Sequence, residues 1–114
     1  MVFKFADFKY EKDNDYDCYP FMSTADMLNK PFRIILAKVM DKKDNSGKKY
    51  VKAVIEFEDG ARFKTTMLGV VLVQTIENIL NYYEGTIPAE VQDSFVKIEQ
   101  TIVNGKPLNV FVDC

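Results

Sequence analysis

The sequence contains no histidine and only two cysteines among its 114 residues. The lack of histidine removes the commonest general base and the commonest metal ligand. Two isolated cysteines, Cys18 and Cys114, are too few for a four-ligand zinc site, and we expect them to be free thiols. No phosphate-binding glycine loop, dinucleotide-binding turn or nucleophile elbow occurs. We therefore expect a protein without catalytic machinery, cofactor or metal.

Long apolar runs are also missing. No run approaches the roughly 18–20 apolar residues that cross a bilayer. The first residues, MVFKFADFKYEKD, interleave charged side chains with apolar ones, which is unlike the apolar centre of a signal peptide. These two absences predict a cytosolic protein with no membrane partner. The net charge of −2 does not by itself predict a polyanionic ligand.

The chain is long enough for one domain with one core, and its 47% hydrophobic and 28% charged residues are ordinary for a folded protein. Residues 1–22 are aromatic and acidic, and we interpret them as an N-terminal arm or an added strand. Residues 23–114 form the predicted domain. It begins with a short helical turn over Ser23–Asn29, in which Ser23 caps the turn and Asp26 follows three residues later. Pro31 is expected to end that turn.

Three β-rich runs follow, at Phe32–Met40, Lys49–Glu58 and Arg62–Met67. The second run alternates cleanly, with Val51, Ala53 and Ile55 on the face expected to be buried. The polar stretch 41–47 predicts the first turn, and the Asp59-Gly60 pair predicts a type I′ hairpin turn. The runs therefore predict a meander of antiparallel strands.

One amphipathic helix is predicted over Val70–Tyr83, with Gly85 placed to stop it. Its apolar stripe is expected to join the core together with Phe57 and Phe63. Two more β runs, Phe95–Val103 and Leu108–Val112, flank the hairpin dipeptide Asn104-Gly105. The order β-β-β-α-β-β predicts a five-stranded barrel of the oligonucleotide/oligosaccharide-binding (OB) type. The alternative is an open α+β sheet with the helix across one face.

A sequence resemblance points the same way. Leu28, Lys30, Pro31 and Phe32 precede and begin the first strand, and Lys49, Tyr50 and Val51 begin the second. A strand rich in Phe and Thr then leads into the helix over residues 63–72. This pattern resembles the small single-stranded-DNA-binding proteins carried by phages and plasmids of Gram-positive bacteria. The resemblance implies an OB fold and binding of single-stranded DNA.

The distribution of charge is independent of that resemblance. Residues 30–64 carry ten basic and five acidic side chains, whereas acids are in excess on both sides of that segment. Lysines there can attract phosphates, and aromatic rings or guanidinium groups can stack on unpaired bases. The candidate nucleic-acid-binding residues are Arg33, Lys38, Lys42, Lys43, Lys48, Tyr50, Lys52, Arg62, Lys64 and Phe111. The alternative is that these residues bind no ligand, because strands commonly place lysine on their solvated face and tyrosine in cross-strand pairs.

Two hypotheses of function follow. The first is sequence-tolerant binding of single-stranded DNA, or RNA, in replication or recombination of a mobile element, by a homodimer or higher oligomer. The second is a small phage-type inhibitor or adaptor of a host protein. It rests on the acidic segment from Asp13 to Asp17, with Tyr16 and Tyr19 interleaved, which can imitate nucleic-acid phosphates toward a basic cleft. Phe111 is expected to point outward by strand parity, either to a base or under the arm.

Overall fold

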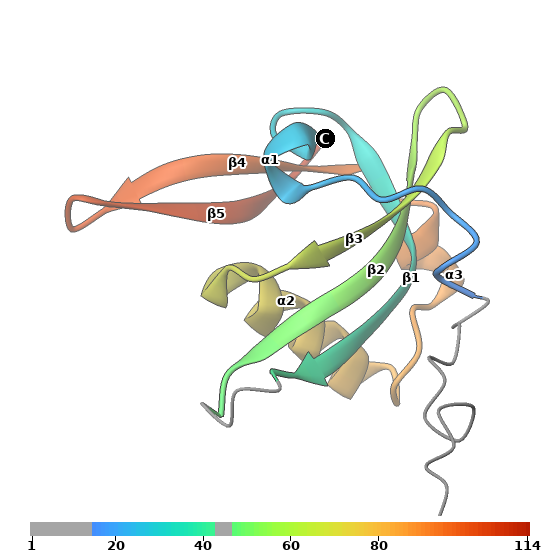
Figure 1. The fold of residues 1–114 in the computed structure, drawn as a ribbon, viewed down its shortest axis with the longest axis horizontal. Helices are drawn as coiled ribbons and strands as arrows, with labels where there is room; N and C mark the ends of the chain where they lie inside the picture. Colours follow the sequence, from blue (N-terminus) through green and yellow to red (C-terminus); the bar gives the residue numbers. More distant parts are fainter. Residues whose placement is uncertain (1–14, 43–46) are drawn as a thin grey trace, which may run out of the picture.

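The computed structural model describes residues 15–42 and 47–114. They form one five-stranded antiparallel sheet and three helices (Figure 1). The elements are α1 (Thr24–Met27), β1 (Phe32–Asp41), β2 (Lys49–Phe57), β3 (Arg62–Met67), α2 (Val70–Tyr82), α3 (Ala89–Gln92), β4 (Val96–Val103) and β5 (Lys106–Asp113). The mainly β class and the predicted order of five strands around one long helix are confirmed. The short helix α3 was not predicted.

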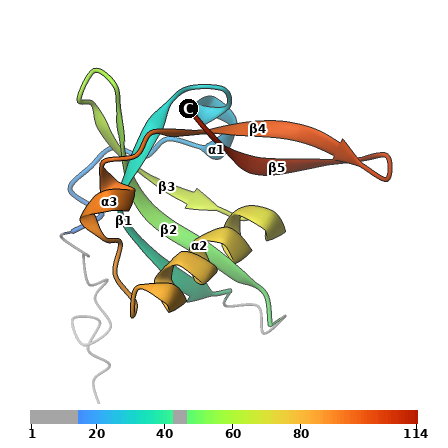
Figure 2. The same ribbon diagram turned by 180° about the vertical axis from the view of Figure 1, so that it is seen from behind.

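The sheet has the strand order β3-β2-β1-β4-β5 and is not closed between its edge strands β3 and β5 in the described part of the chain. β1 pairs with β2 along nearly all of its length, but its register with β4 consists of Phe32 opposite Val96. The hairpin β4–β5 extends away from the other strands (Figures 1 and 2). An antiparallel sheet is therefore established, and closure into a barrel is not.

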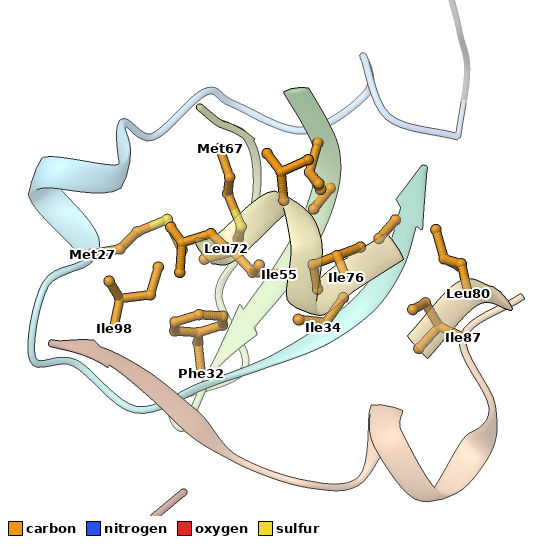
Figure 3. Close-up of a cluster of buried hydrophobic side chains, with 14 residues drawn as sticks. Met27, Phe32, Ile34, Ile55, Met67, Leu72, Ile76, Leu80, Ile87 and Ile98 are labelled. Atoms are coloured by element: carbon orange, nitrogen blue, oxygen red, sulfur yellow. The ribbon is translucent and has the colours of Figure 1, made fainter. Parts of the chain in front are cut away.

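The core lies between α2 and one face of β1–β3. On β2, Val51, Ala53 and Ile55 are fully buried, which confirms the face predicted from the alternation. Helix α2 covers this face (Figure 2) and contributes Leu72 and Ile76, both fully buried. Figure 3 shows these helix residues together with further core side chains from outside β2, at Met27, Phe32, Ile34, Met67 and Ile98. Phe57 and Phe63 are partly buried and pack against this cluster, as expected.

Two hairpin turns differ in a way that the dipeptides alone do not reveal. Asn104 and Gly105 both have positive φ, 53° and 77°, as a type I′ turn requires. At the β2–β3 turn Gly60 has a φ of 86°, while Asp59 is not among the residues with positive φ. Phe57 pairs with Ala61 across a three-residue loop, and the Asp59 carboxylate accepts from the Ala61 amide at 3.0 Å. The prediction of a type I′ turn at Asp59-Gly60 is therefore wrong, since only the glycine is left-handed.

The helix ends follow local chemistry. The Ser23 side chain accepts a hydrogen bond from the Asp26 amide and donates one to its carboxylate, which confirms the predicted cap of α1. Helix α1 ends at Met27, well before Pro31. Beyond α2, Gly85 takes a φ of 91° and its amide donates to the Leu80 carbonyl at 2.6 Å, as predicted for the stop. None of the helices in the described ranges has the length and apolar character needed to cross a membrane.

A bulge in β1 changes which residues share a face. The register of β1 against β2 shifts between Ile34 and Leu36, so that Ile35 is the extra residue. Before the bulge Arg33 points away from α2, and after it Lys38 does so. Strict alternation would place these two side chains on opposite faces, because their separation is odd. The bulge therefore brings two predicted site residues to the same side of the sheet.

Candidate nucleic-acid interface

The side of β1–β3 that faces away from α2 is here called the outer face. Pairing aligns Lys38 with Lys52 and Thr66 across the three strands, and Val54 with Leu36 and Lys64 in the next row. The outer face therefore contains these predicted site residues: Arg33, Lys38, Tyr50, Lys52, Arg62 and Lys64. Val54 is fully buried there, so the centre of this face is not an ordinary solvated surface.

The outer face is occupied by the described end of the N-terminal arm, residues 15–22, which we call the lead-in segment. The Asp17 carboxylate lies 3.4 Å from the Lys52 ammonium and 3.2 Å from that of Lys64. Its side chain is only 8% exposed, whereas those of the two lysines are 19% and 29% exposed. One carboxylate thus bridges lysines on adjacent strands, where solvent screens the attraction less than at an open surface.

The ring of Tyr16 lies on the same lysines. The Lys38 ammonium is 4.6 Å from the ring centroid and the Lys52 ammonium is 5.1 Å from it, both within the range of a cation–π contact. Tyr16 is 7% exposed, so the ring is packed against the protein rather than displayed to solvent. Lys52 takes part in both contacts, because it touches the ring and the Asp17 carboxylate.

A second acid forms ion pairs with the two arginines of the outer face. Glu56 is buried, and its carboxylate accepts from Arg33 Nε at 2.9 Å and from Arg62 Nε at 2.6 Å. The hydrogen bonds from Arg62 and Arg33 hold the pKa of Glu56 below its ordinary value. Arg33 also lies over the Phe95 ring at 5.6 Å. Both guanidinium groups thus make ion pairs within the protein.

The remaining lysines of the predicted set lie elsewhere. Lys42 and Lys48 line a hollow of about 360 Å³ beside the start of α2, together with Lys49. Lys49 pairs with Glu77 of α2 at 3.1 Å, and this contact raises the pKa of Lys49. Lys43 falls outside the described residues. The predicted basic set is therefore divided between the outer face and this hollow at the end of the β1–β2 hairpin.

The two aromatic residues of the predicted site, Tyr50 and Phe111, lie in different parts of the fold. Tyr50 lies on the outer face opposite Met40 and is half-buried. Phe111 lies opposite the fully buried Ile98 and packs against the core. It lines an apolar cavity of about 270 Å³ with Ile34 and Ile76. The prediction that Phe111 points outward is wrong, because Phe111 and not Val110 or Val112 lies on the side of β5 that packs against the core.

Sequence reasoning did not assign three of the residues that organise this face. The sequence presents Tyr16 and Asp17 as groups offered to a partner, and it assigns no role to Glu56. The available signal was the acidic and aromatic composition of the arm beside a segment rich in lysine. That complementarity also fits an intramolecular contact, which spacing alone does not reveal. Asp13, the other end of the predicted acidic segment, lies outside the described residues.

Comparisons with models of protein families, with curated proteins and with solved structures each found no match. Cys18 and Cys114 are exposed free thiols. Among the residues that the structure describes, no group of three or more cysteines, aspartates or glutamates is arranged to hold a metal ion. The outer face carries ammonium and guanidinium groups, phenol rings and carboxylates.

Proposed function

We propose that the protein binds single-stranded nucleic acid, DNA in the first instance, on the outer face of β1–β3. The observation that carries the proposal is the cluster formed by Lys38, Lys52 and Lys64 on three adjacent strands. Lys52 and Lys64 contact the Asp17 carboxylate, and Lys38 and Lys52 contact the Tyr16 ring. Binding of an unpaired strand needs the same two kinds of contact, to a phosphate and to a base.

The mechanism is capture and stacking, with no covalent step. Ammonium groups attract the backbone, and base stacking on an aromatic side chain contributes about 1–3 kcal/mol per base. Tyr50 is the half-buried ring on the outer face. The order of strands and the helix between β3 and β4 support an OB-type arrangement, in which this sheet is the usual ligand surface. The sequence resemblance to phage and plasmid single-strand binders supports the same function. It also favours a role in replication or recombination of a mobile element.

A single domain of this size contacts few nucleotides, so useful affinity favours a dimer or cooperative binding along a strand. The competing hypothesis, an acidic segment presented to a host protein, needs Tyr16 and Asp17 at the surface. Their side chains are instead 7% and 8% exposed. The contacts therefore favour nucleic acid as the ligand of the outer face.

The test is a fluorescence anisotropy titration of labelled oligo-dT and of its duplex with oligo-dA. We expect tighter binding of the single strand and a slope of log K against log salt of about −2, from roughly −0.7 for each of three phosphate contacts. Lys52→Glu should abolish most of this binding, and Tyr50→Ala should weaken it without changing the slope. Lys106→Glu, at the start of β5 on the distant β4–β5 hairpin, makes the same change in net charge and is the matched control. A flat titration at micromolar protein and low salt, for the wild type and for Asp17→Asn alike, would overturn the proposal and direct the search to protein partners.

A further inference from the structure

The lead-in segment is attached to the candidate site by its backbone. Phe21 forms a parallel bridge with Lys64 of β3. The Met22 amide donates to the Lys64 carbonyl at 2.9 Å, and the Lys64 amide donates to the Pro20 carbonyl at 2.9 Å. Residues 20–22 thus extend the edge of β3 by a single bridge, and the turn that follows them toward the N-terminus delivers Tyr16 and Asp17 to the outer face.

Asp17 and Tyr16 make the two kinds of contact that a nucleotide makes, one through an anionic group and one through an aromatic ring. A carboxylate between two ammonium groups makes the charge-assisted contact that a phosphate oxygen would make. A phenol ring against two ammonium groups makes a contact through its π face, as a stacked base can. Lys52 contributes to both interactions, at 3.4 Å from the Asp17 carboxylate and 5.1 Å from the Tyr16 centroid.

We propose that the lead-in segment is an intramolecular competitor that covers the nucleic-acid site and is displaced when a single strand binds. The inference depends on the proposed function, since it concerns the regulation of the same site. Asp17 competes with a phosphate for Lys52, because its carboxylate already occupies part of the ammonium group and repels a second anion beside it. Near β3 the segment makes one backbone bridge and a hydrogen bond from Arg62 to Tyr19, and Met22 at its end packs against the core. Displacement therefore concerns the turn that contains Tyr16 and Asp17, and Met22 stays in place. While the segment is in place, a higher concentration of nucleic acid is needed for binding, and anions with lower affinity for the lysines are excluded.

The first arm of the test compares Asp17→Asn with Glu84→Gln in the full-length protein. Both substitutions remove one negative charge, but Glu84 lies beyond the end of α2, away from the outer face. Relative to the control, Asp17→Asn should bind oligo-dT about three- to tenfold more tightly at low salt, because the ion pairs that compete with phosphate are lost. Tyr16→Ala should change affinity in the same direction. Circular dichroism verifies that each variant is folded.

The second arm measures the position of the segment directly. Cys18 is exposed and adjacent to Asp17, so a nitroxide attached to it in a Cys114→Ser background reports the mobility of the segment. Addition of oligo-dT should increase that mobility, and duplex DNA at the same concentration should not. A label that stays immobile while oligo-dT binds would overturn displacement and leave the proposed function intact.

The affinities separate the remaining outcomes. Equal affinities of Asp17→Asn and Glu84→Gln would show that Asp17 does not compete, and weaker binding by Asp17→Asn would make it part of the binding surface. Either result overturns the inference and preserves the proposed function. Absence of oligo-dT binding in every protein, Asp17→Asn included, would overturn the proposed function and the inference with it.

Discussion

The Phe32 ring joins the two halves of the sheet, and its removal provides the strongest test of the fold. Phe32 is fully buried and pairs with Phe57 on β2 and with Val96 on β4. Its ring meets that of Phe57 edge to face, with centroids 6.5 Å apart. Truncation to alanine should cost about 3–5 kcal/mol, the range for a large aromatic side chain in a core that relaxes incompletely.

That loss is a large fraction of the roughly 5–15 kcal/mol by which domains are stable, and it should lower Tm by about 10 °C or more. The assay is urea unfolding followed by far-ultraviolet circular dichroism and by tyrosine fluorescence, whose coincidence tests two-state behaviour. Phe21→Ala is the chemically matched control, because that side chain is 57% exposed and its truncation should change stability by about 0.5 kcal/mol or less. A loss below about 1 kcal/mol for Phe32→Ala would refute the packing of β1 against β4 described above.

Two further predictions concern charge and backbone. Because Arg62 and Arg33 depress the pKa of Glu56 below its ordinary 4.5, its contribution to stability is present above that value and is lost as the pH falls through the lowered pKa. The Tm of the wild type should therefore exceed that of Glu56→Gln at neutral pH and fall more steeply in acid; parallel Tm–pH curves would contradict the pairing. Gly60→Ala should cost about 1 kcal/mol, since no atom obstructs an added Cβ but the φ of 86° is unfavourable for it. Gly69→Ala, at a φ of −63°, is its control in the same urea titration.

The strands and the long helix could be predicted because their signals are local. Alternation along β2 identified the buried face at Val51, Ala53 and Ile55, and helical spacing identified Leu72 and Ile76. Asn104-Gly105 predicted its turn because both residues tolerate positive φ. Asp59-Gly60 did not, because the type of turn also depends on the loop length that strand pairing selects.

The composition of the candidate site was less predictable because it depends on contacts between distant segments. The bulge at Ile35 places Arg33 and Lys38 on one face, and no residue type in the run marks its position. The partners Asp17 and Lys64 are far apart in the sequence, so their pairing follows from the fold alone. Glu56 appeared to be one more outward acid on an alternating strand, but the two arginines that flank it across β1 and β3 bury it.

Internal ion pairs offset part of the positive charge of the outer face. An excess of lysine between residues 30 and 64 predicts an open basic patch only if those charges lack internal partners. Here Asp17 and Glu56 each pair with two cations of the outer face, so its long-range positive field is weaker than the count of lysines suggests. We therefore expect slower association with nucleic acid while Asp17 and Tyr16 cover the lysines. In the proposed mechanism, displacement of Asp17 exposes Lys52 and Lys64, whereas Glu56, held from two strands, remains in place. Nucleic-acid binding and displacement of the segment then favour each other at the lysine cluster.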